Sequence, residues 1–220
     1  MVRGQARFLA VSAGIIYLAL LARAVLIGSA AWEENLREWL YWHTERAQFA
    51  MEDLLAFDQK AAPLLVGVLV VALFATRYRR ASLFLLVGAG GAATLGVAAK
   101  AIAGLLSTGA RDFPSGHATG SAGVAAALVL LLWDRPYRLV IAFTGVALVG
   151  VYGFVLVATD WHTPSEVLGG WFLALAWVMG VWLAAERARF PDARISPAAS
   201  DEARRARWEA RQERSLEPRA

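Results

Sequence analysis

The sequence predicts an all-α, polytopic membrane protein: a bundle of six transmembrane helices with one amphipathic helix at the membrane interface. Two observations lead to this fold class. Hydrophobic residues make up 58% of the 220 residues, and the mean hydropathy is +0.49, which is high for a soluble domain. These residues also occur in blocks, and a block of about 18 or more apolar residues can cross a bilayer as a helix.

Six such blocks follow one another along the chain. We expect spans at residues 8–32, 61–76, 81–106, 117–133, 139–159 and 164–185. The second span is short and takes additional length from its flanks. The first contains Arg23 and Gly28-Ser29-Ala30, so a cleaved signal peptide is the alternative there, although the apolar stretch is longer than a typical signal core.

Basic residues predict the orientation of the bundle. With six spans, four clusters of arginine fall on one side, and the positive-inside rule assigns that side to the cytoplasm. The clusters are Arg3 and Arg7; Arg77, Arg79 and Arg80; Arg135 and Arg138; and Arg187, Arg189 and Arg194. We therefore expect a multi-pass plasma (inner) membrane protein with both termini in the cytoplasm, a membrane domain at 1–190 and a charged cytoplasmic tail at 191–220.

The segment 33–60 joins the first two spans on the opposite, outer side. Its leucines recur near helical spacing among acidic residues, and Trp39 and Trp42 add an aromatic belt. This pattern predicts an amphipathic helix at the membrane surface. A plain interfacial connector is the interpretation that we favour, and a lid over a site is the alternative.

Composition also excludes several classes of chemistry. The chain has no cysteine, so disulfides, thiolate nucleophiles and cysteine-bound metals are excluded. The net charge is +4, which we attribute to the cytoplasmic arginines and not to nucleic-acid binding. We expect no metal and no cofactor, and the sequence leaves the oligomeric state open.

Ionisable residues near the spans gather on the outer side. Lys100 lies about 19 residues into the third span, which at ~1.5 Å per residue carries it roughly 28 Å to the outer interface. His117 and His162, two of the three histidines, meet at the same face. Because charges at the edge of a membrane span are costly, this grouping indicates a functional site.

Two short strings carry the predicted chemistry. Ser115-Gly116-His117 opens a span, and the exposed N–H groups of such a helix start favour an anion, which Lys100 would help to bind. A plain N-cap role for Ser115 is the alternative. In the second string, Glu166 follows His162 by four residues, so its carboxylate can orient the imidazole for nucleophilic attack. A capping box from Thr163 to Glu166 is the alternative there, and both roles can coexist.

These residues resemble the type 2 phosphatidic acid phosphatase superfamily. The resemblance rests on Pro114-Ser115-Gly116-His117 and on His162 with its acid four residues later, followed by Val167-Leu168-Gly169-Gly170. It is strongest over 95–175. It implies a six-helix membrane bundle with its site at the outer face, and metal-independent hydrolysis of a lipid phosphate or pyrophosphate through a phosphohistidine.

The resemblance also implies a role for each matching residue. His162 corresponds to the nucleophile, with Glu166 as its carboxylate partner, and His117 corresponds to the general acid. Lys100, Ser115 and Gly116 correspond to phosphate-binding positions. The implied partners are a phosphorylated lipid substrate and the surrounding membrane lipids.

The chain departs from the family pattern at two arginines. Ser107-Thr108 stand where the first motif has Arg-Pro, and Val155-Leu156 stand where the third motif has Ser-Arg. We therefore predict that Arg111, in the shortened connection before Pro114, binds the phosphate. The alternatives to a hydrolase are a lipid phosphotransferase that uses the same histidine, and a catalytically degenerate lipid-binding membrane protein.

Overall fold

The computed structural model describes residues 3–76, 78–187, 205 and 208–209, and these residues form helices without any strand. The α-helices are α1 (Arg3–Leu26), α2 (Ala31–His43), α3 (Gln48–Lys60), α4 (Ala62–Ala75), α5 (Arg79–Leu85), α6 (Gly91–Leu106), α7 (Gly116–Leu131), α8 (Arg138–Ala158) and α9 (Pro164–Arg187). Shorter turns are η1 (Glu45–Ala47), the π-helical η2 (Leu86–Gly90) and η3 (Thr108–Ala110). The predicted tail, 191–220, lies outside the described residues except for Arg205, Trp208 and Glu209.

Four helical segments are long and apolar enough to cross a membrane. They are α1, the continuous α5–η2–α6 segment Arg79–Leu106, α8 and α9. Two further apolar helices, Pro63–Ala75 and Gly116–Leu131, are shorter than a typical span. The structure therefore confirms an all-helical protein with several apolar helices suited to a membrane, while the count of six spans stays a prediction.

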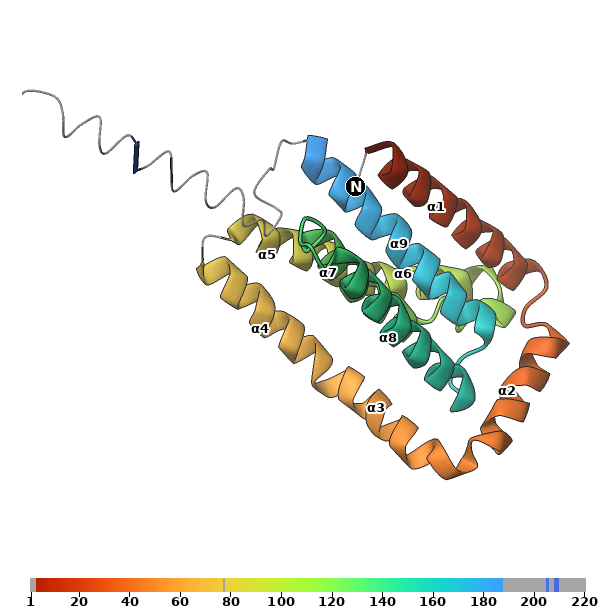
Figure 1. The fold of residues 1–220 in the computed structure, drawn as a ribbon. Coiled ribbons are helices and arrows are strands. Elements are labelled where there is room, and N and C mark those ends of the chain that lie inside the picture. The colour runs from red at the N-terminus through yellow and green to blue at the C-terminus, as the bar shows by residue number, and fades with distance from the viewer. Residues whose placement is uncertain (1–2, 77, 188–204, 206–207, 210–220) are drawn as a thin grey trace, which may run out of the picture.

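The predicted amphipathic helix at 33–60 is two helices in the structure. α2 ends at His43, with Thr44 as its C-cap, and α3 begins after the η1 turn. α3 then continues almost directly into α4, because the Ala61 N–H still donates to Phe57 and the Ala61 carbonyl accepts from Leu65. In Figure 1, α3 and α4 form one bent rod beside the bundle, and α2 crosses one end of it. The interfacial location of this segment stays a prediction.

α9 is the central helix of the bundle. It lies between α1 and α7 (Figure 1), and its small residues allow close approach. The largest buried cluster surrounds Trp182 of α9, with Phe84 of α5 against the indole ring and Ala6 of α1 on another side. This packing places α9 where its first turn can meet the first turn of α7.

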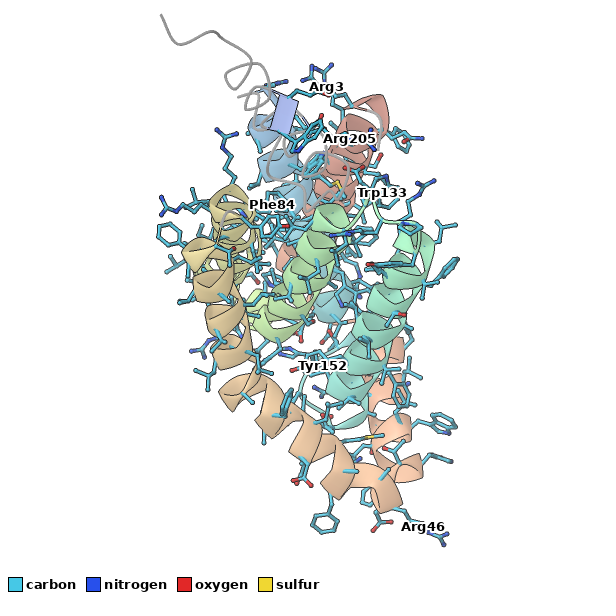
Figure 2. All side chains as sticks on the ribbon, turned by 60° about the vertical axis from the view of Figure 1, so that its left-hand side comes forward. Arg3, Arg46, Phe84, Trp133, Tyr152 and Arg205 are labelled. Atoms are coloured by element: carbon cyan, nitrogen blue, oxygen red, sulfur yellow. The ribbon has the colours of Figure 1, made fainter. Side chains whose placement is uncertain are left out.

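The two ends of the bundle differ in character. One end carries the start of α1, the α4–α5 and α7–α8 connections and the end of α9, with those of the arginines predicted to be cytoplasmic that the structure describes: Arg3, Arg7, Arg79, Arg80, Arg135, Arg138 and Arg187. Figure 2 shows Arg3 and Trp133 at this basic end and Arg46 at the opposite end. The opposite end, called here the site end, carries α2, η3 and the α8–α9 connection, which include the predicted site residues.

Candidate active site

His162 is positioned by the way in which α8 ends. Asp160 adopts a left-handed backbone conformation, with φ of 62°. The N–H groups of Trp161 and His162 both donate to the Leu156 carbonyl at 3.1 Å, and the Asp160 N–H donates to Val157 at 3.2 Å. These bonds form a Schellman-type helix end, in which the chain reverses direction at the left-handed residue. The turn directs His162 back toward the start of α9, where it is 6% exposed.

Glu166 makes both contacts that the sequence left open, one with His162 and one that caps α9. Its Oε2 atom lies 2.8 Å from His162 Nδ1 and accepts a bond from the Thr163 N–H at 3.0 Å. The second contact is half of a capping box at the start of α9. The first contact holds Nδ1 of the imidazole, so that Nε2 is the ring nitrogen left for chemistry.

Ser115 caps α7. Its Oγ atom accepts from the Ala118 N–H at 3.2 Å, and its own N–H donates to the Glu166 carbonyl at 3.0 Å. The residue is fully buried, which agrees with the N-cap alternative. The next residue, Gly116, faces open space where a Cβ would stand. The first-turn N–H groups of a helix have no carbonyl partner within it, so this space suits an anion.

Two glycines of α9 bring the histidines together. A Cβ on Gly170 would lie 2.7 Å from the Ser115 carbonyl oxygen, and one on Gly169 would lie 2.4 Å from the Phe113 ring. Both distances exclude a side chain, so the Gly-Gly pair lets the first turns of α7 and α9 touch. As a result, the rings of His117 and His162 have centroids 6.4 Å apart.

Lys100 stands at the edge of the same group. Its Nζ atom lies 3.0 Å from Asp112 Oδ1. The hydrogen bond from Lys100 lowers the pKa of Asp112 against a smaller opposing effect of burial, and the charges of Lys100, His162 and Arg111 lower it further. Asp112 is therefore ionised at neutral pH and forms an ion pair with Lys100 in this structure. Arg111 follows η3 and is exposed.

A long apolar cavity opens from this group. Its volume is about 1440 Å³. Lys100, Gly116, His117 and His162 line one end, while Leu128 and Ile141 line the far end near the basic end of the bundle. The walls between them come from α4, α6, α7 and α8 and are almost entirely aliphatic. Among the described residues, Asp112 contributes to this lining and Arg111 does not.

The comparison with protein families gives a match over the part of the chain that holds these residues. Residues 97–190, from the second turn of α6 to just past α9, match the PAP2 superfamily. This part of the chain is similar to the PAP2 superfamily. This match confirms the resemblance predicted from Pro-Ser-Gly-His and the His162–Glu166 pair, with its divergent first and third motifs.

A solved structure shares the fold of this chain. It is described as the "first transmembrane PAP2 type phosphatidylglycerolphosphate phosphatase from Bacillus subtilis", with a TM-score of 0.68 and 19% sequence identity. The similarity covers 81% of this chain and 96% of that one. A search of curated protein sequences gave no match.

The PAP2 region receives polar contacts from residues that sequence reasoning did not single out. Arg37 Nε of α2 lies 2.8 Å from Asp160 Oδ1, and Gln48 Nε2 of α3 donates to the Ala158 carbonyl at 3.1 Å. Glu33 Oε1 accepts from the Ser165 N–H at 2.9 Å. Sequence separation hides these contacts, because nothing in the acidic face of α2 distinguishes Glu33 from Glu34 and Glu38.

Proposed function

We propose that this chain is a metal-independent lipid phosphatase that hydrolyses a lipid phosphate or pyrophosphate through a phosphohistidine on His162. The observation that carries the proposal is the His162–Glu166 contact of 2.8 Å at the mouth of an apolar cavity. An imidazole held at Nδ1 by a carboxylate is an activated nucleophile. The similarity of residues 97–190 to the PAP2 superfamily and the fold shared with a transmembrane PAP2-type phosphatase support the same reaction.

The first chemical step transfers the phosphoryl group to His162. The lone pair of Nε2 attacks phosphorus, and the bond between phosphorus and the lipid oxygen breaks. His117 donates a proton to the departing oxygen, acting as a general acid. The proton stays on Nδ1 and is hydrogen-bonded to Glu166, whose negative charge stabilises the phosphorylated imidazole.

The second step releases phosphate. A water molecule attacks phosphorus from the side that the lipid oxygen has left, and His117, now neutral, takes the water's proton. The P–N bond breaks, and its electrons return to Nε2. Lys100 and the first-turn N–H groups of α7 would hold the phosphoryl oxygens in both steps, because phosphoryl transfer depends on positioned cations and donors. Ser115 supports this turn as its cap, and Arg111 remains our predicted second cation.

The cavity suits the hydrocarbon tail of such a substrate. Its aliphatic lining begins at the proposed phosphate site and runs along α7 toward Leu128. A lipid in the bilayer could therefore place its phosphate at His162 with its tail still in an apolar environment. The described members of the four predicted arginine clusters lie at the basic end, so we propose six spans with the site end facing the extracytoplasmic side of the plasma membrane.

A trapping experiment tests this function. Purified protein in detergent is incubated with lipid phosphates and pyrophosphates carrying ³²P, quenched, and assayed for released phosphate and for acid-labile label on the protein. We expect His162→Ala to lose the label and about 10⁴-fold in turnover. His117→Ala should lose about 10²- to 10⁴-fold, most severely with poor leaving groups. His43→Ala is the matched control, since this third histidine is exposed and bonds to the Trp39 carbonyl.

The same assay separates the alternatives. Full turnover in His162→Ala would refute the assignment of the nucleophile. A phosphorylated acceptor in place of inorganic phosphate would identify a phosphotransferase. Loss of turnover with a chelator would contradict metal independence, whereas we expect inhibition by vanadate, which imitates the phosphoryl transition state.

A further inference from the structure

Glu33 is a fully buried carboxylate to which the proposed reaction gives no role. It lies in the first turn of α2 and has no exposed surface. Its Oε1 atom accepts from the Ser165 N–H at 2.9 Å, while Oε2 accepts from the Ala30 N–H at 3.0 Å and pairs with Arg23. A buried charge is tolerated when its oxygens are bonded in this way.

These contacts keep Glu33 ionised. Burial raises the pKa of its carboxyl, but the bonds from Ala30, Arg23 and Ser165 and the charge of Arg23 together bring that pKa below its ordinary value. Glu33 is thus a fixed negative charge at neutral pH, and it stands at the start of α9. The N-terminus of a helix favours a negative charge, because its first N–H groups point toward it.

Glu33 and Glu166 divide the N–H groups at the start of α9 between them. Glu166 takes the Thr163 N–H, Pro164 has none, and Glu33 takes the Ser165 N–H. Ser165 is the residue directly before Glu166. A bond to its amide therefore restrains the backbone from which the Glu166 side chain reaches His162.

We propose that Glu33 is a positioning residue for the His162–Glu166 pair, holding the first turn of α9 in place so that the Glu166 carboxylate stays bonded to His162 Nδ1. The inference rests on the proposed phosphatase function. It extends the catalytic apparatus to α1 and α2, which precede the residues matched by the PAP2 superfamily.

Two neighbouring contacts attach the segment from α2 to α3 to the end of α8 and to the turn that follows it. Arg37 binds Asp160, and Gln48 binds the Ala158 carbonyl. The segment from α2 to the start of α3 is therefore bonded at three points, to the end of α8, to the α8–α9 connection and to the start of α9. This arrangement favours a segment that supports the site over the lid considered from the sequence. Glu33 is the most buried of the contacting residues.

The test compares Glu33→Gln with Glu186→Gln. The glutamine at position 33 keeps the shape but has one acceptor atom, so it cannot serve Ser165 and the Ala30–Arg23 pair together. Glu186→Gln is the matched control, because it removes a carboxylate that also joins α9 to a neighbouring helix, pairing with Arg3 of α1, but at the basic end of the bundle.

Two readouts are taken on folded, monodisperse protein. The first is turnover, for which we expect kcat in Glu33→Gln to fall on the order of 10- to 100-fold, as for a misplaced catalytic group, with KM changed less than about threefold. The second is the NMR resonance of the His162 Nδ1 proton, which is simple to assign among three histidines. We expect it to shift or broaden in Glu33→Gln and to stay unchanged in Glu186→Gln.

Each outcome supports or overturns the inference. A folded Glu33→Gln variant with kcat within twofold of the parent, or with an unchanged His162 resonance, overturns it, even if the melting temperature falls. If that variant does not fold, Glu33→Asp replaces it, since aspartate keeps the charge beside Arg23 but shortens the reach to Ser165, and the same two results are decisive. A parent protein without phosphatase activity refutes the proposed function. The His162 resonance alone then tests whether Glu33 positions the His162–Glu166 pair.

Discussion

At the scale of single residues, one oxygen atom of Glu166 connects folding to chemistry. Oε2 accepts from both the Thr163 N–H and the His162 ring. The bond that caps α9 thus fixes the place from which the carboxylate can reach the imidazole. A shorter acid at this position would have to give up one of the two contacts, so the glutamate suits the backbone of this chain.

Asp112 holds Lys100 in the described structure, and an arriving phosphate would have to displace it. We predict that Asp112→Asn strengthens phosphate binding by about 1.5- to 5-fold, since the pair is partly exposed and such pairs contribute little energy. The measurement is the inhibition constant of inorganic phosphate. Glu34→Gln is the control, because it removes a charge at the same end of the bundle without touching Lys100.

The pH dependence of this effect has a defined sign. The pKa of Asp112 is lowered, chiefly by the hydrogen bond from Lys100, so the ion pair and its small stabilising effect persist at neutral pH and disappear as pH falls through that lowered pKa. The ordinary pKa is 3.8, so the ratio of inhibition constants between parent and Asp112→Asn should be constant from about pH 5 to 8. A ratio that varies within this range, or one equal to that of Glu34→Gln, would contradict the prediction.

The sequence predicted the site residues that lie close together in the chain. The four-residue spacing alone predicted the contact between Glu166 and His162. The helix start at Gly116 predicted that His117 lies at the same end of the bundle. Spacing carried no information about contacts between distant segments, so Glu33, Arg37 and the left-handed turn at Asp160 were missed. Arg111 was selected by elimination, and its exposure leaves its phosphate-binding role a prediction.

At the scale of helices, the bent rod formed by α3 and α4 bounds the cavity opposite α8. Gly67 of α4 lines this cavity, and a Cβ there would meet no atom within 4 Å. A side chain at this position would therefore occupy the space proposed for the lipid tail. Leucine would also favour the helix over glycine, so folding should not suffer.

We predict that Gly67→Leu lowers kcat/KM for a long-chain lipid phosphate by about tenfold or more, in line with the cost of filling an apolar pocket. Turnover of a short-chain phosphate ester should stay within about twofold, since the phosphate site is untouched. Gly180→Leu is the control: its Cβ also meets open space, but the residue lies on α9 outside the cavity lining. Equal losses for long and short substrates would place the tail elsewhere.

The helices were predicted well where hydropathy alone defines them. Apolar length located α1, α8 and α9. The segment 33–60 was harder, because amphipathic spacing continues through Thr44, where the chain turns at η1. Only Ala61 separates the end of α3 from the start of α4. Alanine is a good helix former, so the sequence carries no signal for a break there.

At the scale of the whole molecule, the arginine clusters at the basic end predict the topology. The chain contains no cysteine, so single cysteines report without background. We expect Glu45→Cys in η1 and Pro136→Cys in the α7–α8 connection to react with a membrane-impermeant reagent from opposite sides of intact cells. Both residues are exposed. Labelling of both from the same side would contradict the proposed six spans.

The bond between Glu33 and Ser165 also has a consequence for biosynthesis. The two residues are 132 positions apart, an interval that a ribosome takes on the order of ten seconds to complete. During that time the carboxylate has Arg23 and Ala30 as partners but lacks the helix that completes its coordination. A chain interrupted before α9 would also lack Glu166, so His162 would have no carboxylate partner. Under the proposed function, hydrolysis would therefore begin only after the N-terminal helices and α9 have packed together. Truncated products would then be inert toward the membrane in which they are made.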